Sequence, residues 1–94
     1  MTHVSHCYPD GASLYYTFIF PRDPNKELEQ FWEVKRAGVQ AIVDNGGTIS
    51  HHHGVGGDHA PWLPKEKGDV GMGILKATKT YLDPKGILNP NKWL

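Results

Sequence analysis

Proline and glycine residues interrupt this chain so often that each uninterrupted stretch has room for one strand or one helix. Near the N-terminus, Pro9, Asp10 and Gly11 separate two runs, residues 4–8 and 12–20, that are rich in β-branched and aromatic side chains. Proline fixes φ and glycine accepts unusual backbone angles, so this arrangement is typical of a turn between two strands. The sequence therefore predicts a β-hairpin.

Alternation along the second run predicts two unlike faces, because side chains two residues apart in a strand lie on the same face. One face is wholly apolar or aromatic and is the predicted core face; its members are Leu14, Tyr16, Phe18 and Phe20. The other face combines hydroxyl groups with apolar neighbours, as expected of a sheet surface beside a polar site; its members are Ser13, Tyr15, Thr17 and Ile19.

The rest of the chain predicts a helix, a third strand and a second helix. Asp23 and Pro24 have the character of a helix N-cap and a first helical residue, and apolar residues at mostly three- and four-residue spacing follow as far as Gly46. Residues 48–53 predict a strand, and residues 66–82 predict a helix before an irregular tail. The order β-β-α-β-α defines an α+β unit with an antiparallel or mixed sheet and helices on one face. Something outside this chain would cover the other face.

Length, charge and cysteine content limit the classes of function. With 94 residues, the chain forms one small domain with a limited core. Ten basic residues balance ten acidic ones, which argues against binding to nucleic acid or to an anionic membrane. No stretch approaches the roughly 20 apolar residues of a membrane span, and the first residues lack the pattern of a signal peptide. Cys7 is alone, as in proteins of reducing compartments, so we expect a cytoplasmic protein.

The run SHHHGVG at residues 50–56 is the strongest candidate for a functional site. A neutral imidazole both donates and accepts hydrogen bonds, so three in a row suit proton handling or metal binding. In a strand, His51 and His53 share one face and His52 lies on the other. The triplet lies in the middle of the chain, which argues against a purification tag. The alternative to a site is a half-buried strand end whose imidazoles bond to backbone and water.

Two further hypotheses concern a metal site and an acid–base residue. His51, His53 and His59 could ligate a divalent metal, although the triplet contains no carboxylate. Tyr15 could act as a general acid or base if a positive charge or a flavin lies nearby. Its alternative role is packing, with the hydroxyl group at the rim of the sheet.

Three runs of the sequence, GASLYYTF at residues 11–18, NGGTISHHHGVG at residues 45–56 and LDPKGILNP at residues 82–90, match a known pattern. Together they resemble the C-terminal end of FAD-linked oxidases of the vanillyl-alcohol-oxidase type. The third run is widespread in that superfamily. The second is more selective and is most similar to the alkyldihydroxyacetonephosphate synthases and their bacterial FAD-binding oxidoreductase relatives.

This resemblance implies that residues 1–94 form the C-terminal part of a substrate (cap) domain and that the FAD-binding domain is absent from this chain. It implies an FAD-dependent enzyme with acid and base residues beside the flavin. The implied catalytic residues are Tyr15, His51, His52 and His53, and the implied FAD contacts are His52, His53 and Asn89. No metal ligand is implied. The chain alone is then expected to be inactive and to hold FAD weakly.

The resemblance also implies the partners, namely the FAD-binding domain of the same polypeptide and a small-molecule substrate. An exposed sheet face would favour homo-oligomers. One departure is Gly57, which directly precedes the run Asp58-His59-Ala60-Pro61. Many bacterial relatives have arginine at this position, and the glycine argues against phosphate binding by that loop. The alternatives are a stand-alone metal-binding module and a non-catalytic fragment that binds a partner. The substrate stays open among an ether-lipid precursor, a 2-hydroxy acid and an aromatic alcohol, as does the choice between oxidation and alkyl exchange.

Overall fold

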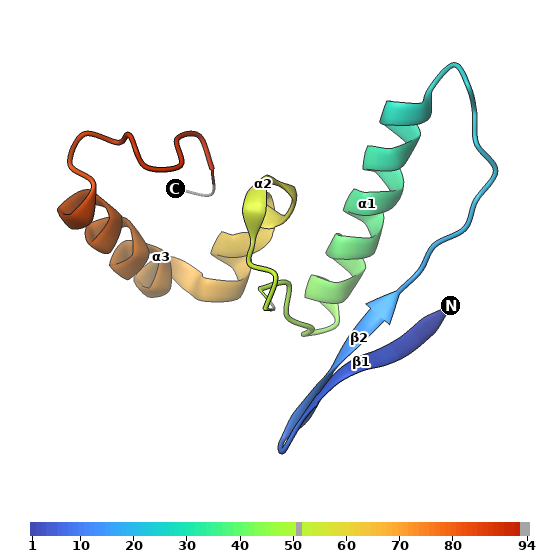
Figure 1. Ribbon diagram of the computed structural model, residues 1–94, viewed down its shortest axis with the longest axis horizontal. Coiled ribbons are helices and arrows are strands. Elements are labelled where there is room, and N and C mark those ends of the chain that lie inside the picture. Colours follow the sequence, from blue (N-terminus) through green and yellow to red (C-terminus); the bar gives the residue numbers. More distant parts are fainter. Residues whose placement is uncertain (51, 93–94) are drawn as a thin grey trace. The chain divides into compact units, whose positions relative to one another are not determined.

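A computed structural model describes residues 1–50 and 52–92 and divides the chain into two compact units, Met1–Glu33 and Val34–Leu94 (Figure 1). The elements are β1 (Thr2–Tyr8), β2 (Gly11–Tyr16), α1 (Glu27–Asp44), α2 (Gly56–His59), the 3₁₀ helix η1 (Ala60–Trp62) and α3 (Leu63–Leu82). The boundary between the units falls within α1. A two-stranded antiparallel sheet combined with helices confirms the α+β class.

The predicted hairpin is confirmed, with strand ends that differ from the prediction. β1 pairs antiparallel with β2 from Tyr8 opposite Gly11 to Thr2 opposite Tyr16. Beyond this ladder, the Thr17 N–H donates to the Met1 carbonyl at 2.8 Å. β2 was expected to continue to residue 20, but it ends at Tyr16, and residues 17–20 are irregular.

The start of α1 differs from the prediction that Asp23 caps a helix beginning at Pro24. Residues 24–26 form a turn, and the Asp23 carboxylate accepts the Asn25 N–H at 2.9 Å within it. The Gln30 side chain, one turn into α1, fastens this entry. It accepts the Asp23 N–H at 3.1 Å and donates to the Pro21 carbonyl at 2.9 Å. The side chain of Asp23 therefore stabilises the approach to the helix rather than its first turn.

The predicted third strand at residues 48–53 is wrong for every residue of it that the structure describes. α1 ends at Asp44, close to the predicted glycine pair; residues 48–50 are then irregular, with a bend at Ile49, and residues 52–53 form a turn. The reason lies in the backbone hydrogen bonds. The Ile49 N–H donates to the Glu66 carboxylate at 2.7 Å, so that carboxylate takes the place of a neighbouring strand.

α3 starts three residues before its predicted beginning and contains a break. Gly68 has φ 66° and ψ 175°, a conformation that is essentially restricted to glycine, and it separates residues 63–67 from the longer part of the helix. Among the described residues, the buried apolar side chains all belong to the second unit; they are Val39, Ile49 and Leu63. The side of α3 that the sequence predicts to be apolar is largely exposed, as at Val70, Ile74 and Tyr81.

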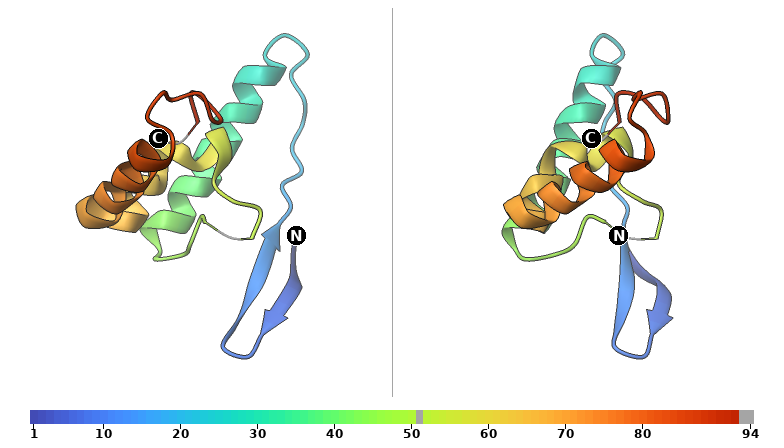
Figure 2. Two further views of the ribbon diagram at one scale, coloured as in Figure 1. Left: turned by 60° about the vertical axis from the view of Figure 1, so that its left-hand side comes forward. Right: turned by 90° about the vertical axis from the view of Figure 1, so that its left-hand side faces the viewer.

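After α3 the chain turns back in an irregular tail, as the sequence predicts (Figure 2). The buried carboxylate of Asp83 accepts the N–H groups of Ile87 and Leu88, both at 3.0 Å, and Lys79 donates to it at 3.0 Å. Burial alone would raise the pKa of Asp83, but the hydrogen bonds from Leu88, Lys79 and Ile87 lower it. In the described part of the chain, no helix combines the length and apolar character that crossing a lipid bilayer requires.

Candidate functional site

Tyr15 lies on β2 directly opposite His3 of β1, and the two rings stack. Their centroids are 5.1 Å apart and their planes differ by 15°. The tyrosine is half-buried although most of the hairpin is exposed. The position of its ring is therefore set from both sides of the ladder, by its own strand and by the partner ring.

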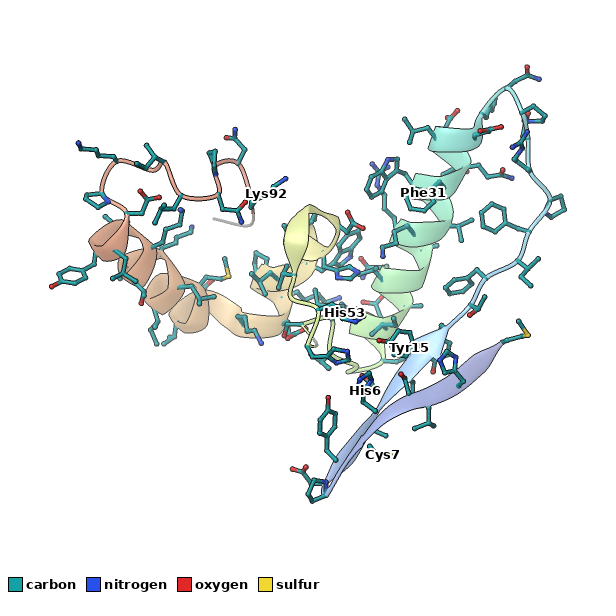
Figure 3. All side chains as sticks on the ribbon, in the orientation of Figure 1. His6, Cys7, Tyr15, Phe31, His53 and Lys92 are labelled. Carbon is teal, nitrogen blue, oxygen red and sulfur yellow. The ribbon has the colours of Figure 1, made fainter. Side chains whose placement is uncertain are left out.

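A bulge in β1 changes which side chains surround Tyr15. The pairing is regular as far as Val4 opposite Leu14, and after an irregularity it resumes with His6 opposite Ser13. Cross-strand partners share a face, and so do Ser13 and Tyr15, two residues apart. His3, His6 and Ser13 are thus on the Tyr15 face. Figure 3 labels His6 and Tyr15 on the two strands of the hairpin.

The sequence prediction missed the two histidines of this face. The turn pairs Tyr8 with Gly11, so counting back from it could have placed His6 opposite Ser13, on the Tyr15 face. His3 could not have been placed in this way, because an unbulged ladder would put it opposite Tyr16, on the other face. The predicted core face is also wrong for this unit, since Leu14 and Tyr16 are 52% and 53% exposed.

The histidine triplet lies in the second unit. His51 is outside the described residues, while His52 and His53 are exposed and form a turn. Their rings meet edge to face, with centroids 4.3 Å apart and an interplanar angle of 74°. The expected division between two strand faces does not apply to His52 and His53, because these residues form a turn and not a strand. Gly54, which ends the turn, has φ 80°, a left-handed conformation that favours glycine.

Glu66 in the first turn of α3 binds the segment directly before the triplet. Its carboxylate accepts the Ile49 N–H at 2.7 Å, the Thr48 hydroxyl at 3.1 Å and the Ser50 hydroxyl. Lys67 donates to Glu66 at 2.8 Å and to the Ser50 Oγ at 2.9 Å. Desolvation would raise the pKa of Glu66, but these hydrogen bonds outweigh it and lower that pKa to about 2. No sequence signal pointed to Glu66.

The loop after the triplet contains His59, a candidate ligand in the metal hypothesis. Burial, together with the charge of Lys35, lowers the pKa of His59, and Asp58 opposes this effect. Asp58 itself lies 3.8 Å from Lys35. Within residues 1–50 and 52–92, no group of three histidine, cysteine, aspartate or glutamate side chains could hold a metal ion. The metal hypothesis relied on His51, which is not among these residues.

Asn89, the implied flavin contact, lies in the C-terminal tail of the second unit. Its φ of 49° is in the left-handed region, which asparagine tolerates better than most residues. The side chains that fix the preceding residues are Asp83, through the two backbone N–H groups described above, and Lys79, which donates to the Leu88 carbonyl at 3.0 Å. The carboxamide is exposed and is a hydrogen-bonding group.

Comparison with known proteins identifies the class. The family model described as FAD linked oxidases, C-terminal domain, matches residues 1–93, and this chain belongs to that family. No solved structure matches the chain.

Among curated relatives, the chain is similar to two alkyldihydroxyacetonephosphate synthases. It is 38% identical over 90 residues to that of Dictyostelium discoideum and 37% identical over 92 residues to that of Trypanosoma brucei brucei. These alignments cover 96% and 98% of the chain and 15% of each relative. It is also 38% identical over 77 residues to the glycolate oxidase subunit GlcD of Bacillus subtilis (strain 168), covering 81% of the chain and 16% of that protein. The chain thus spans about a sixth of the length of these relatives.

Proposed function

We propose that this chain forms the C-terminal active-site portion of an FAD-dependent oxidoreductase or of an enzyme similar to alkyldihydroxyacetonephosphate synthase. The observation that carries the proposal is the half-buried Tyr15, stacked on His3 on a hairpin face that also includes His6 and Ser13. A phenol next to imidazole groups suits proton transfer to and from a substrate. The family match over residues 1–93 supports FAD as the cofactor.

In this proposal, the residues of the chain bind, orient and exchange protons. Bound FAD supplies the redox chemistry. The Tyr15 hydroxyl gives or takes a proton at the reacting carbon of the substrate, and His51, His52 and His53 contact the substrate and relay protons. His52, His53 and Asn89 would contact the flavin. The exposed imidazoles and carboxamide fit this role, because they can donate and accept hydrogen bonds with a ring that another domain holds.

The proposed partner is the FAD-binding domain of the same polypeptide. Many large apolar side chains are exposed in the described chain, and contact with such a domain would bury them. The strongest examples are Ile19, Leu28, Val70 and Tyr81. We further propose that the isolated chain is inactive and binds FAD weakly, and that the enzyme works in the cytoplasm. Self-association of the isolated chain through its apolar side chains would be the competing use of that surface.

The test is Tyr15→Phe in the full-length flavoprotein, meaning the polypeptide that joins this segment to an FAD-binding domain. Loss of the hydroxyl should lower kcat by about 10²-fold or more, the range of general acid–base catalysis, and leave the flavin bound. The matched control is Tyr16→Phe, which removes a hydroxyl from the opposite, more exposed face of the same strand. Equal activity of the two variants would refute the role of Tyr15. Assays with an ether-lipid precursor, with 2-hydroxy acids and with aromatic alcohols would separate the three substrate classes.

A further inference from the structure

Glu66 has an unusual number of contacts for a glutamate near the start of a helix. Its side chain is only 15% exposed and receives hydrogen bonds from the backbone of Ile49, the hydroxyls of Thr48 and Ser50, and the ammonium of Lys67. Three of these four donors belong to consecutive residues. The carboxylate therefore fixes a continuous segment of loop rather than a single side chain.

That segment is also held by an apolar contact. The Ile49 side chain is 3% exposed, so it is buried in the second unit while the N–H of the same residue donates to Glu66. A residue fixed through both its side chain and its backbone has little freedom of rotation. The histidine triplet begins two residues further on, immediately after Ser50.

Lys67 completes the arrangement around Ser50. The Ser50 hydroxyl donates to Glu66, and its oxygen accepts from the Lys67 ammonium at 2.9 Å. The Ser50 N–H in turn donates to the Thr48 Oγ1 at 3.3 Å. The last residue before the triplet is thus oriented by its backbone and by both functions of its hydroxyl group. The low pKa of Glu66 keeps the carboxylate charged throughout the neutral range.

We propose that Glu66 is a positioning residue that holds residues 48–50 and thereby sets the place and direction of His52 and His53. Its consequence for catalysis rests on the proposed function of the histidines. Its consequence for the backbone does not. Gly68 then breaks the helix two residues later, so the turn that carries Glu66 is a short unit of residues 63–67.

The experiment uses Glu66→Gln in the full-length flavoprotein. An amide offers one acceptor atom where the carboxylate offers two, so the Ile49 N–H and the two hydroxyls must compete for it. Amide hydrogen exchange in residues 48–53 should become about tenfold faster, and kcat should fall by about tenfold with KM changed less than about twofold. Ser50→Ala, which removes one donor, should have a smaller effect in the same direction. The matched control is Asp44→Asn, which removes a carboxylate that Lys65 and Gln40 contact in the same unit.

Two readouts separate this inference from the proposed function. Unchanged exchange at residues 48–53 in Glu66→Gln would overturn the inference, and so would faster exchange with an unchanged kcat when His53→Ala lowers kcat. If His53→Ala and His52→Ala leave kcat unchanged while Glu66→Gln speeds amide exchange, the positioning role of Glu66 is supported. The proposed function of the histidines then fails. An equal effect of Asp44→Asn on exchange would also overturn the inference, because it would indicate general loosening of the unit.

Discussion

The hairpin and the histidine segment both present chemically useful side chains, but they hold them by different means. Tyr15 is held in place by strand pairing, which involves many backbone hydrogen bonds, and by His3, which stacks on its ring. The triplet follows a loop that depends on one carboxylate and one buried side chain, Glu66 and Ile49. A single substitution should therefore disturb the second region far more than the first.

The largest effect is expected from Ile49→Ala. Truncation of a buried isoleucine removes apolar burial and leaves a cavity, so the free energy of unfolding should fall by about 2–5 kcal/mol. Leu14→Ala in the hairpin is the comparison, since Leu14 is 52% exposed and should cost far less. Chemical denaturation of the chain measures both variants. Similar losses would mean that the two regions do not differ in the way described.

The next largest effect is a pH dependence of the stabilisation that Glu66 gives to the histidine segment. The pKa of Glu66 is about 2 in the folded protein and 4.5 ordinarily, so the unfolded state binds its proton first as the pH falls. The stabilisation is complete above about pH 4.5 and is lost as the pH falls towards 2. The protection of the residue 48–50 amides, meaning the intrinsic exchange rate divided by their observed rate at the same pH, should decrease across that window, and Glu66→Gln should abolish this component. The same dependence in the variant would assign the acid response to another group.

A smaller effect is expected where the triplet ends. Gly54 has φ 80°, so Gly54→Ala should cost about 1 kcal/mol through backbone strain, although a Cβ there meets no atom within 4 Å. Gly57→Ala is the matched control, because Gly57 has equal space and no positive φ. Thermal unfolding compares the two. A neutral Gly54→Ala would show that the turn after the histidines adapts without cost.

The smallest effect concerns the stack in the hairpin. His3→Ala removes a cross-strand ring pair, which contributes about 0.2–1 kcal/mol. The ring protons of Tyr15 should shift in the NMR spectrum because they lose the ring current of the imidazole, whereas His3→Phe should keep a stack. Unshifted Tyr15 signals in His3→Ala would mean that the tyrosine ring is held by β2 alone.

The sequence predicted the features that depend on local chemistry. The turn around Pro9 and Gly11, the face shared by Ser13 and Tyr15, and the end of α1 near Gly46 follow from backbone preferences and from a period of two or about 3.6 residues. The family was likewise accessible from the runs at residues 45–56 and 82–90, and the family match confirms it.

The features that escaped prediction depend on contacts between distant residues. Residues 48–50 have the composition of a strand, but Glu66 satisfies the Ile49 N–H from 17 positions away. The bulge that brings His3 opposite Tyr15 is a property of pairing and not of composition. Val70 and Tyr81 are apolar on the predicted side of α3, yet the described chain contains nothing that buries them.

The break at Gly68 divides α3 into a short part, residues 63–67, and a longer C-terminal part. A continuous helix would move as one rigid body, so any tilt of its C-terminal part on contact with another domain would also move the first turn. Because Gly68 has φ 66° and ψ 175°, the longer C-terminal part of α3 can change direction while the Glu66 carboxylate stays hydrogen-bonded to residues 48–50. The direction of residues 69–82 is therefore not fixed by a continuous helix to the position of the Glu66 carboxylate.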